Sequence, residues 1–308
     1  MDRTRIVVGV DGSAASRQAV LVAAWLGPLV DAEVVAVHAV GLLDDVHDPG
    51  EETGAWRSRL HDRVARTWCA GLAEAGTPHR VVVRDGPGVD VLLAVAQDEN
   101  AALVVVGSRG VGATDPAQAL GSTSLHLLQV ARCPVLVVPE VSRAGAPGPP
   151  ALRHTLVGVD RSEGSLAALD LAADLAVVAG GSLSVLEVFE YVDPFPLGPE
   201  AARTSEAEER TIEATTRLVE GHVDAVRDRG VEVQVIVRSG DPAPTLVEVA
   251  DDVDADLVVV GTRGRGDPAR PLLGSVARAV VDGVRRPTLV VPAAAGAVRL
   301  HGAGAGSG

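Results

Sequence analysis

The stretch Leu103-Val-Val-Val-Gly-Ser-Arg-Gly110 occurs a second time in the chain, as Leu257-Val-Val-Val-Gly-Thr-Arg-Gly264. In both copies apolar residues follow one another without alternation, which is typical of a strand buried on both faces of a parallel sheet. Each strand runs into a Gly-x-x-Gly loop. Ligands of parallel sheets bind in the loops beyond the carboxyl ends of the strands. The stretch therefore predicts a buried parallel strand and a ligand-binding loop, both present twice.

Two further stretches repeat in the same order along the chain. Ile6-Val-Val-Gly-Val-Asp11 returns as Thr155-Leu-Val-Gly-Val-Asp160, and Cys133-Pro-Val-Leu-Val-Val-Pro139 returns as Pro287-Thr-Leu-Val-Val-Pro292. The period is the size of a whole domain, whereas the units of a solenoid are only ~20–50 residues long. The repeats therefore predict a tandem duplication of one domain.

The domain limits follow from composition. We predict a first domain over 1–140, a linker over 141–152, a second domain over 153–292 and a disordered tail over 293–308. The linker is rich in Pro and Gly and the tail in Ala and Gly, as expected for segments without a core. A length of 308 residues suits two domains of ~150 residues each.

Short Val-rich runs alternate with longer helical patterns in each copy. This alternation predicts an α/β fold of two tandem doubly wound parallel sheets, with helices on both faces. The expected strands are 5–10, 33–40, 80–84, 103–107 and 135–138, then 154–159, 182–189, 231–237, 257–261 and 287–291. The expected helices are 13–27, 53–75, 88–98 and 118–130, then 162–179, 199–229, 242–253 and 272–283.

Composition excludes several classes of function. All 27 basic residues are arginines, which excludes a lysine-dependent phosphate loop, a Schiff-base enzyme and a lysine nucleophile. A net charge of −14 argues against a nucleic-acid partner. No apolar run approaches the ~18 residues of a membrane span. Cys69 and Cys133 have no metal-ligand spacing, and two unpatterned cysteines indicate a reducing, cytoplasmic location.

The loop after the first strand reads Asp11-Gly-Ser13 in one copy and Asp160-Arg-Ser162 in the other. Two interpretations are open. Asp or Ser accepts a hydrogen bond from a free amide at the start of the next helix, as an N-cap does. Alternatively, the carboxylate lies at the switch point of the sheet and contacts a ligand hydroxyl or a cation.

The loop after the fourth strand carries a longer glycine pattern. In the second copy Gly261, Gly264 and Gly274-Ser275 fit G-x2-G-x9-G-S, and Ser275 opens a helical pattern. Glycines allow backbone amides to approach phosphate oxygens, and a helix N-terminus attracts anions. Arg263, together with Arg265 and Arg270, adds guanidinium groups suited to phosphate. The alternative is a turn-rich loop without a ligand.

These features together resemble the universal stress protein (UspA-type) family, and the chain resembles a tandem two-domain member over about 3–139 and 153–292. The resemblance implies a Rossmann-like, adenine nucleotide alpha hydrolase-like fold that binds ATP, with Mg²⁺. It implies that the glycine loop holds the phosphates, that the aspartate lies in the pocket and that backbone at the end of the second strand meets adenine. The implied residues are Asp160, Val188, Gly261, Arg263, Gly264, Gly274 and Ser275, and in the first copy Asp11, Ala39, Gly107, Arg109, Gly110, Gly121 and Ser122.

The first copy departs from the pattern, because ten residues rather than nine separate Gly110 from Gly121. Val111 also stands where the second copy has Arg265. The extra residue can displace phosphate-binding amides. We therefore expect the second copy to bind ATP and the first to bind it equally or more weakly.

The resemblance also implies that the terminal strands, 135–138 and 287–291, pair within the chain as a pseudo-dimer, because such strands are otherwise open sheet edges. A homodimer and an unidentified protein partner are left open. No nucleophile–base pair is evident, so no catalytic residue is assigned. The resemblance implies an ATP-binding regulatory or protective protein of a bacterial stress response. The alternatives are a slow ATPase or autophosphorylating enzyme, and an interaction protein that binds no nucleotide.

Two other groups have a structural and a functional interpretation. His38 is expected to be structural or at the solvent edge, since Glu187 replaces it in the second copy. Asp251, Asp252, Asp254 and Asp256 are expected to form a polar turn, with a cation site as the alternative.

Overall fold

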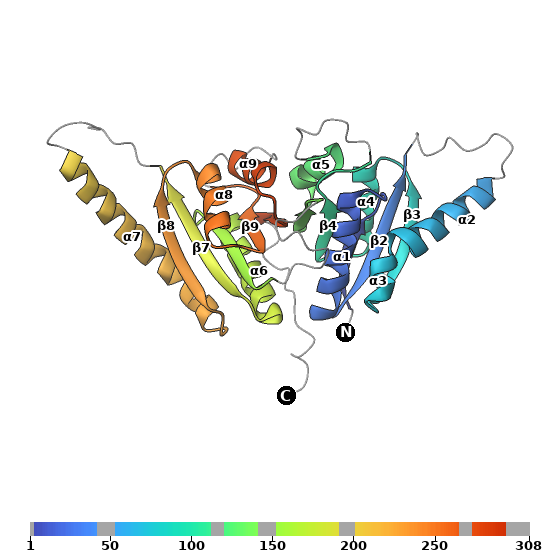
Figure 1. Cartoon of the computed structure of the whole chain (residues 1–308), viewed down its shortest axis with the longest axis horizontal. Helices are drawn as coiled ribbons and strands as arrows, with labels where there is room; N and C mark the ends of the chain where they lie inside the picture. Colours follow the sequence, from blue (N-terminus) through green and yellow to red (C-terminus); the bar gives the residue numbers. More distant parts are fainter. Residues whose placement is uncertain are drawn as a thin grey trace.

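The structure, a computed structural model, describes residues 3–41, 53–111, 120–140, 152–190, 201–264 and 273–293, with the side chains of 53–54 and 201–205 left aside. Most of the predicted linker, most of the predicted tail, Arg265 and Arg270 lie outside these residues. The chain forms two wings that meet at the centre of the molecule (Figure 1).

Strands and helices alternate in both copies, as predicted. The first copy contains β1 (Thr4–Gly9), α1 (Ala14–Leu29), β2 (Ala32–Val40), α2 (Thr53–Arg63), the π-helix η1 (Val64–Trp68), α3 (Ala70–Glu74), β3 (His79–Asp85), α4 (Gly88–Asp98), β4 (Leu103–Gly107), α5 (Ser122–Val130) and β5 (Val135–Val138). The second contains β6 (His154–Val159), α6 (Glu163–Ala179), β7 (Ser182–Phe189), α7 (Ala201–Arg227), β8 (Val233–Ser239), α8 (Pro242–Asp252), β9 (Leu257–Gly261), α9 (Ser275–Gly283) and β10 (Thr288–Val291). Among the described residues, no helix is long and apolar enough to cross a membrane.

All ten strands form one sheet, in the order β3-β2-β1-β4-β5-β10-β9-β6-β7-β8. Neighbouring strands are parallel within each half, and the two halves join where β5 pairs antiparallel with β10, with Leu136 opposite Leu289. The predicted fold of two doubly wound parallel sheets is confirmed. The pairing of the terminal strands within the chain is confirmed as well, and it removes the open edge that β5 and β10 would each present in a separate half.

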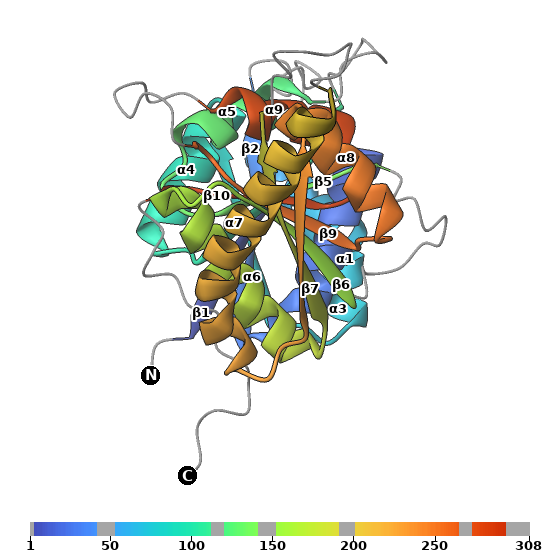
Figure 2. The ribbon, with the colours of Figure 1, turned by 90° about the vertical axis from the view of Figure 1, so that its left-hand side faces the viewer.

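Helices cover both faces of the sheet, and each face has one apolar core shared by the two halves. The core on the α1 and α6 face contains Leu136 of β5 and Leu289 of β10, and the core on the opposite face contains Val135 and Val290 of the same strands. Figure 2, viewed from the α7 end, shows α7 in front of the second half of the sheet. Because each core crosses the β5–β10 junction, the halves are one packed body.

The expected single helix over 53–75 is interrupted. A π-turn at η1 lets the amide of Cys69 donate to the carbonyl of Val64, and both side chains are fully buried. The extra residue of a π-turn brings two positions five apart onto the core-facing side of the helix. The same turn carries Trp68 toward the loop after β1, where its indole packs against Gly12.

The strand expected at 231–237 begins two residues later, at Val233. Val231 is buried, but it precedes the ladder, in which Val233 is paired with Leu183. The prediction began the strand too early because Val231 is apolar. The polar end of the strand, Arg238 and Ser239, is paired with β7 instead.

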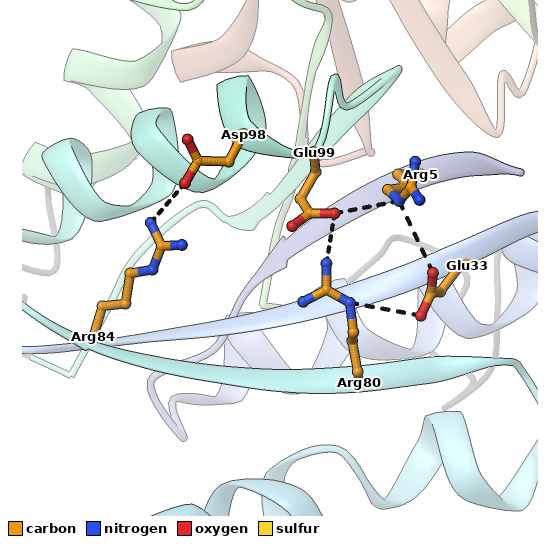
Figure 3. Close-up of polar contacts among 6 residues, drawn as sticks. All are labelled: Arg5, Glu33, Arg80, Arg84, Asp98 and Glu99. Carbon is orange, nitrogen blue, oxygen red and sulfur yellow. Dashed lines mark hydrogen bonds and ion pairs between the residues drawn. The ribbon is translucent and has the colours of Figure 1, made fainter. Parts of the chain in front are cut away.

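Four charged side chains form a network of ion pairs at the amino ends of β1, β2 and β3 (Figure 3). Arg5 lies 3.2 Å from Glu99 and 4.0 Å from Glu33, and Arg80 lies 2.5 Å from Glu99 and 3.6 Å from Glu33. Glu99 follows the last residue of α4, so the network ties this helix to three strands. Nearby, Arg84 makes a separate, exposed ion pair with Asp98 of α4.

In the second copy the same place holds His154, two serines and a glutamine. The ring nitrogens of His154 lie 2.7 Å from the hydroxyl of Ser182 and 2.9 Å from that of Ser184. The hydroxyl of Ser184 donates to Gln234. The duplicated strands therefore keep their register, while the arginine–glutamate ion pairs at their amino ends are replaced by hydrogen bonds among a histidine, serines and a glutamine.

The ionic network yields a stability prediction. Glu99→Gln removes the carboxylate that both arginines share, and its side chain is only 19% exposed. We expect a loss of about 1–2 kcal/mol in the free energy of unfolding at low salt, shrinking at 1 M NaCl. Asp98→Asn, which breaks only the exposed pair, is the control and should cost less than about 0.5 kcal/mol. Equal losses in urea unfolding of the two variants would contradict this account.

The buried cysteine yields a reactivity prediction. Burial raises the pKa of the Cys69 thiol to about 11, so about one molecule in a thousand carries the thiolate at pH 8. We expect Cys69 to react with iodoacetamide at least tenfold more slowly in the folded protein than in 8 M urea, with the rate rising as the pH approaches the pKa. Peptide mass spectrometry measures this. Equal rates in both conditions would show that the thiol is not buried.

Candidate functional site

The order of strands places a switch point between β1 and β4 in the first half and between β6 and β9 in the second. The loops that leave these strands meet at each switch point. In the first half they are 10–13 and 108–111, and in the second they are 160–162 and 262–264. The sequence-predicted aspartates and the second glycines of the pattern, Gly110 and Gly264, lie in these loops.

Serine, and not aspartate, caps the helix after the first strand. The hydroxyl of Ser13 accepts from the amide of Ser16 at 3.1 Å, and Asp11 Oδ1 accepts from the amide of Ser13 at 2.9 Å. The second copy repeats the arrangement, with Ser162 as the cap. Of the two interpretations left open, capping belongs to the serines. The aspartates instead stiffen the turn.

The other oxygen of each aspartate faces the glycine loop. Asp11 Oδ2 accepts from the amide of Val111 at 3.1 Å, and a Cβ placed on Gly110 would lie 2.6 Å from this oxygen. A Cβ on Gly264 would overlap Asp160 in the same way. Glycine is therefore needed at the second glycine position of each Gly-x-x-Gly pattern, because a larger residue would separate the loop from the carboxylate.

The capping serines also join the two loops. The hydroxyl of Ser13 donates to the carbonyl of Arg109 at 3.2 Å. The hydroxyl oxygen of Ser162 lies 3.4 Å from the carbonyl oxygen of Arg263, while its hydrogen is donated to Asp160 Oδ1 at 2.6 Å. Sequence reasoning had not assigned the serines this contact between loops. They hold the turn after the first strand against the loop after the fourth.

The first glycine of each pattern has a packing role. A Cβ on Gly107 would lie 2.7 Å from the backbone of Ala15 and Ser16, and one on Gly261 would lie 2.8 Å from the backbone of Gly164. These glycines let the helix after the first strand approach the fourth strand closely. They place the helix start beside the loop.

The last glycine and the serine after it open the next helix, as expected. Gly121 is the N-cap of α5 and Gly274 that of α9, and neither has a side chain to accept from the first amides. The amide of Gly121 donates to the carbonyl of Ser108 at 2.7 Å, and that of Gly274 donates to Thr262 at 2.8 Å. Each loop thus returns to the strand it left, which brings the helix N-terminus to the switch point.

The remaining predicted residues lie at the same edge of the sheet. Ala39 and Val188 are the next-to-last residues of β2 and β7, each one strand away from the aspartate of its copy. The guanidinium of Arg109 lies 3.4 Å from Glu140. Arg263 is exposed in the second loop. Every predicted site residue therefore lies beside a switch point, in two separate groups.

The sequence analysis singled out His38 and Glu187 but did not assign them the contacts that they make beside each site. His38 is buried, its Nδ1 lies 2.7 Å from the carbonyl oxygen of Val10, and its ring meets the edge of Trp68. The solvent-edge interpretation of His38 is thus wrong, and the structural one is correct. In the second copy Glu187 pairs with Arg161.

The acidic turn before β9 is structural. Asp256 accepts from the amides of Arg153 and His154 at 2.8 and 3.1 Å. Asp251 and Asp254 pair with the buried Arg286. Across the described ranges, no group of three or more His, Cys, Asp or Glu residues could hold a metal ion. The polar-turn interpretation therefore accounts for these carboxylates.

Comparison with known proteins identifies the family. The model of the "Universal stress protein family" matches residues 2–139 and again 151–292. Universal stress protein Rv1996 of Mycobacterium tuberculosis is 32% identical over 312 residues, which cover 92% of this chain and 94% of that protein. Among solved structures, a universal stress protein from Archaeoglobus fulgidus covers 95% of this chain and all of its own, with a TM-score of 0.67 and 18% identity. A shorter match, a universal stress protein in complex with cAMP, covers 46% of this chain at 26% identity and a TM-score of 0.33. The chain belongs to the universal stress protein family, as a tandem member with two copies of the domain.

Proposed function

We propose that this chain binds ATP, with Mg²⁺, at the two switch points, and that it acts in the cytoplasm as a regulatory or protective protein of a bacterial stress response. Membership of the universal stress protein family supports the role in stress. The observation that supports nucleotide binding is the helix N-terminus without a side-chain cap beside a glycine loop, which both copies build. The proposed domains remain 1–140 and 153–292.

The phosphate end of the proposed site consists of backbone. The first amides of α5 and α9 have no side-chain partner from their glycine N-caps, and a helix N-terminus with a glycine loop is a general anion site. The hydroxyls of Ser122 and Ser275 would add donors there. The arginines Arg109 and Arg263 would add charge from the loop.

The remaining parts of the ligand have polar and apolar neighbours at the same edge. Asp11 and Asp160 would accept from ligand hydroxyls, and the backbone at Ala39 and Val188 would meet the base. Mg²⁺ takes most of its ligands from nucleotide phosphates and water, so it requires no cluster of protein carboxylates. A family member binds cAMP, but the proposal for this chain rests on its own residues.

Paired glycine variants test the proposal. Gly264→Ala should push Asp160 away from its loop and weaken ATP at the second site at least tenfold, and Gly110→Ala should do the same at the first. Calorimetry on the full chain should show two equivalents of ATP for the wild type and one for each variant. Gly221→Ala is the control, because a Cβ there meets nothing within 4 Å.

The outcomes separate the open alternatives. A wild-type chain without ATP binding would favour an interaction protein that uses no nucleotide. Unchanged stoichiometry and affinity in both glycine variants would show that ATP binds elsewhere.

Phosphate release tests the enzymatic alternative. Both oxygens of the Asp11 carboxylate accept hydrogen bonds from backbone amides, so this group holds the loop in place. We therefore expect no steady release of phosphate from ATP above that of the Gly110→Ala/Gly264→Ala double variant. Steady release by the wild type that the double variant abolishes would identify a slow ATPase instead.

A further inference from the structure

The two sites are supported by different chemistry at one pair of positions. Gly12 of the first copy corresponds to Arg161 of the second, and His38 corresponds to Glu187, each with the same sequence offset as the aspartates. Both positions differ between the copies, and in each copy the two residues belong to one connected group of side chains. The two differences are therefore coupled in space.

In the first copy an aromatic side chain supports a glycine turn. Gly12 has a φ of +79°, and a Cβ on it would lie 2.6–2.8 Å from Cε2, Cζ2 and Nε1 of Trp68. The indole of Trp68 thus fills the space that a side chain at position 12 would occupy. Its ring meets His38 at a centroid distance of 5.0 Å and an angle of 73°.

In the second copy an ion pair supports a non-glycine turn. Arg161 has a φ of +63°, a left-handed conformation that is strained for a residue with a side chain. Its Nη2 lies 2.9 Å from Glu187 Oε1, and the Glu187 side chain is only 4% exposed. A buried carboxylate requires a cation, so Glu187 holds Arg161 in place and is stabilised by it.

The two arrangements exclude one another. A side chain at position 12 would collide with Trp68, which the π-turn of η1 brings to the site. In the second copy α7 runs from Ala201 to Arg227 as one α-helix, and all three tryptophans of the chain lie in the first copy. The second copy therefore has no indole to place beside the turn at Arg161.

Arg161 stands inside the turn that the proposed nucleotide site uses. Its neighbours Asp160 and Ser162 are joined by hydrogen bonds of 3.0 Å from the Ser162 amide and 2.6 Å from the Ser162 hydroxyl. We propose that Arg161 and Glu187 are positioning residues of the second site. Their ion pair holds the left-handed turn so that the Asp160 carboxylate faces Gly264. Gly12 and Trp68 perform this task in the first site. The consequence for ligand binding rests on the proposed function.

Hydrogen exchange tests the positioning role without a ligand. In full-length Arg161→Ala, we expect the amide of Ser162 to exchange at least tenfold faster than in the wild type, while that of Ser13 is unchanged. Glu187→Gln leaves no buried carboxylate unpaired, since only the more exposed Arg161 guanidinium loses its partner, and it therefore guards against a folding failure. It should give a smaller increase, about threefold. Unchanged exchange at Ser162 in both variants would overturn the proposal.

ATP affinity then tests the consequence. In a Gly110→Ala background, which leaves the second site to be measured, Arg161→Ala should raise the Kd for ATP at least tenfold, and Arg161→Lys, which keeps the charge, should restore it to within about threefold. Arg229→Ala is the matched control, because it breaks ion pairs with Asp170 and Asp174 elsewhere in the second copy and should leave the Kd unchanged.

Hydrogen exchange and ATP affinity test the positioning role and the proposed function independently. Faster exchange at Ser162 in a protein whose second site binds no ATP would refute the proposed function and leave the positioning role standing. An unchanged Kd in Arg161→Ala, or an equal rise in Arg229→Ala, would overturn the positioning role in ligand binding.

Discussion

The contact between an aspartate after the first strand and a glycine loop after the fourth is the constraint on which each half depends. It needs a carboxylate at Asp11 or Asp160, and it needs no side chain at Gly110 or Gly264. The parallel sheet brings these loops to one switch point, and the helix N-termini of α5 and α9 return to the same place. The order of strands thus brings the loops together, and the glycines allow the carboxylates to contact them.

The pairing of β5 with β10 joins the two halves into one packed body. Both cores cross the junction, so each copy is stabilised by the other. The polar groups at the amino ends of the strands differ between the copies, with ion pairs around Glu99 in the first and hydrogen bonds around His154 in the second. The same holds for the support of the sites, where Trp68 and the Arg161–Glu187 pair solve one problem in two ways.

The strands could be predicted because runs of consecutive valines are typical of strands buried on both faces of a sheet. The candidate site loops could be predicted because their glycine spacing can be read from a short stretch of sequence. The break of the helix at η1 could not, since it depends on Val64 and Cys69 both facing a core formed by distant residues. The roles of Trp68 and Arg161 depend on tertiary contacts as well. The sequence nonetheless contained a signal for these roles. Gly12 and His38 are both replaced by charged residues, Arg161 and Glu187, at the equivalent positions of the second copy.

The central claim is that one chain carries two nucleotide sites at the switch points of a single sheet. Native mass spectrometry of the intact protein with ATP and Mg²⁺ tests it most directly, since each bound nucleotide adds its own mass. The account predicts a species with two nucleotides per chain at saturating ATP, reduced to one by a single glycine-to-alanine change in either loop. A chain that carries no nucleotide at millimolar ATP would contradict it.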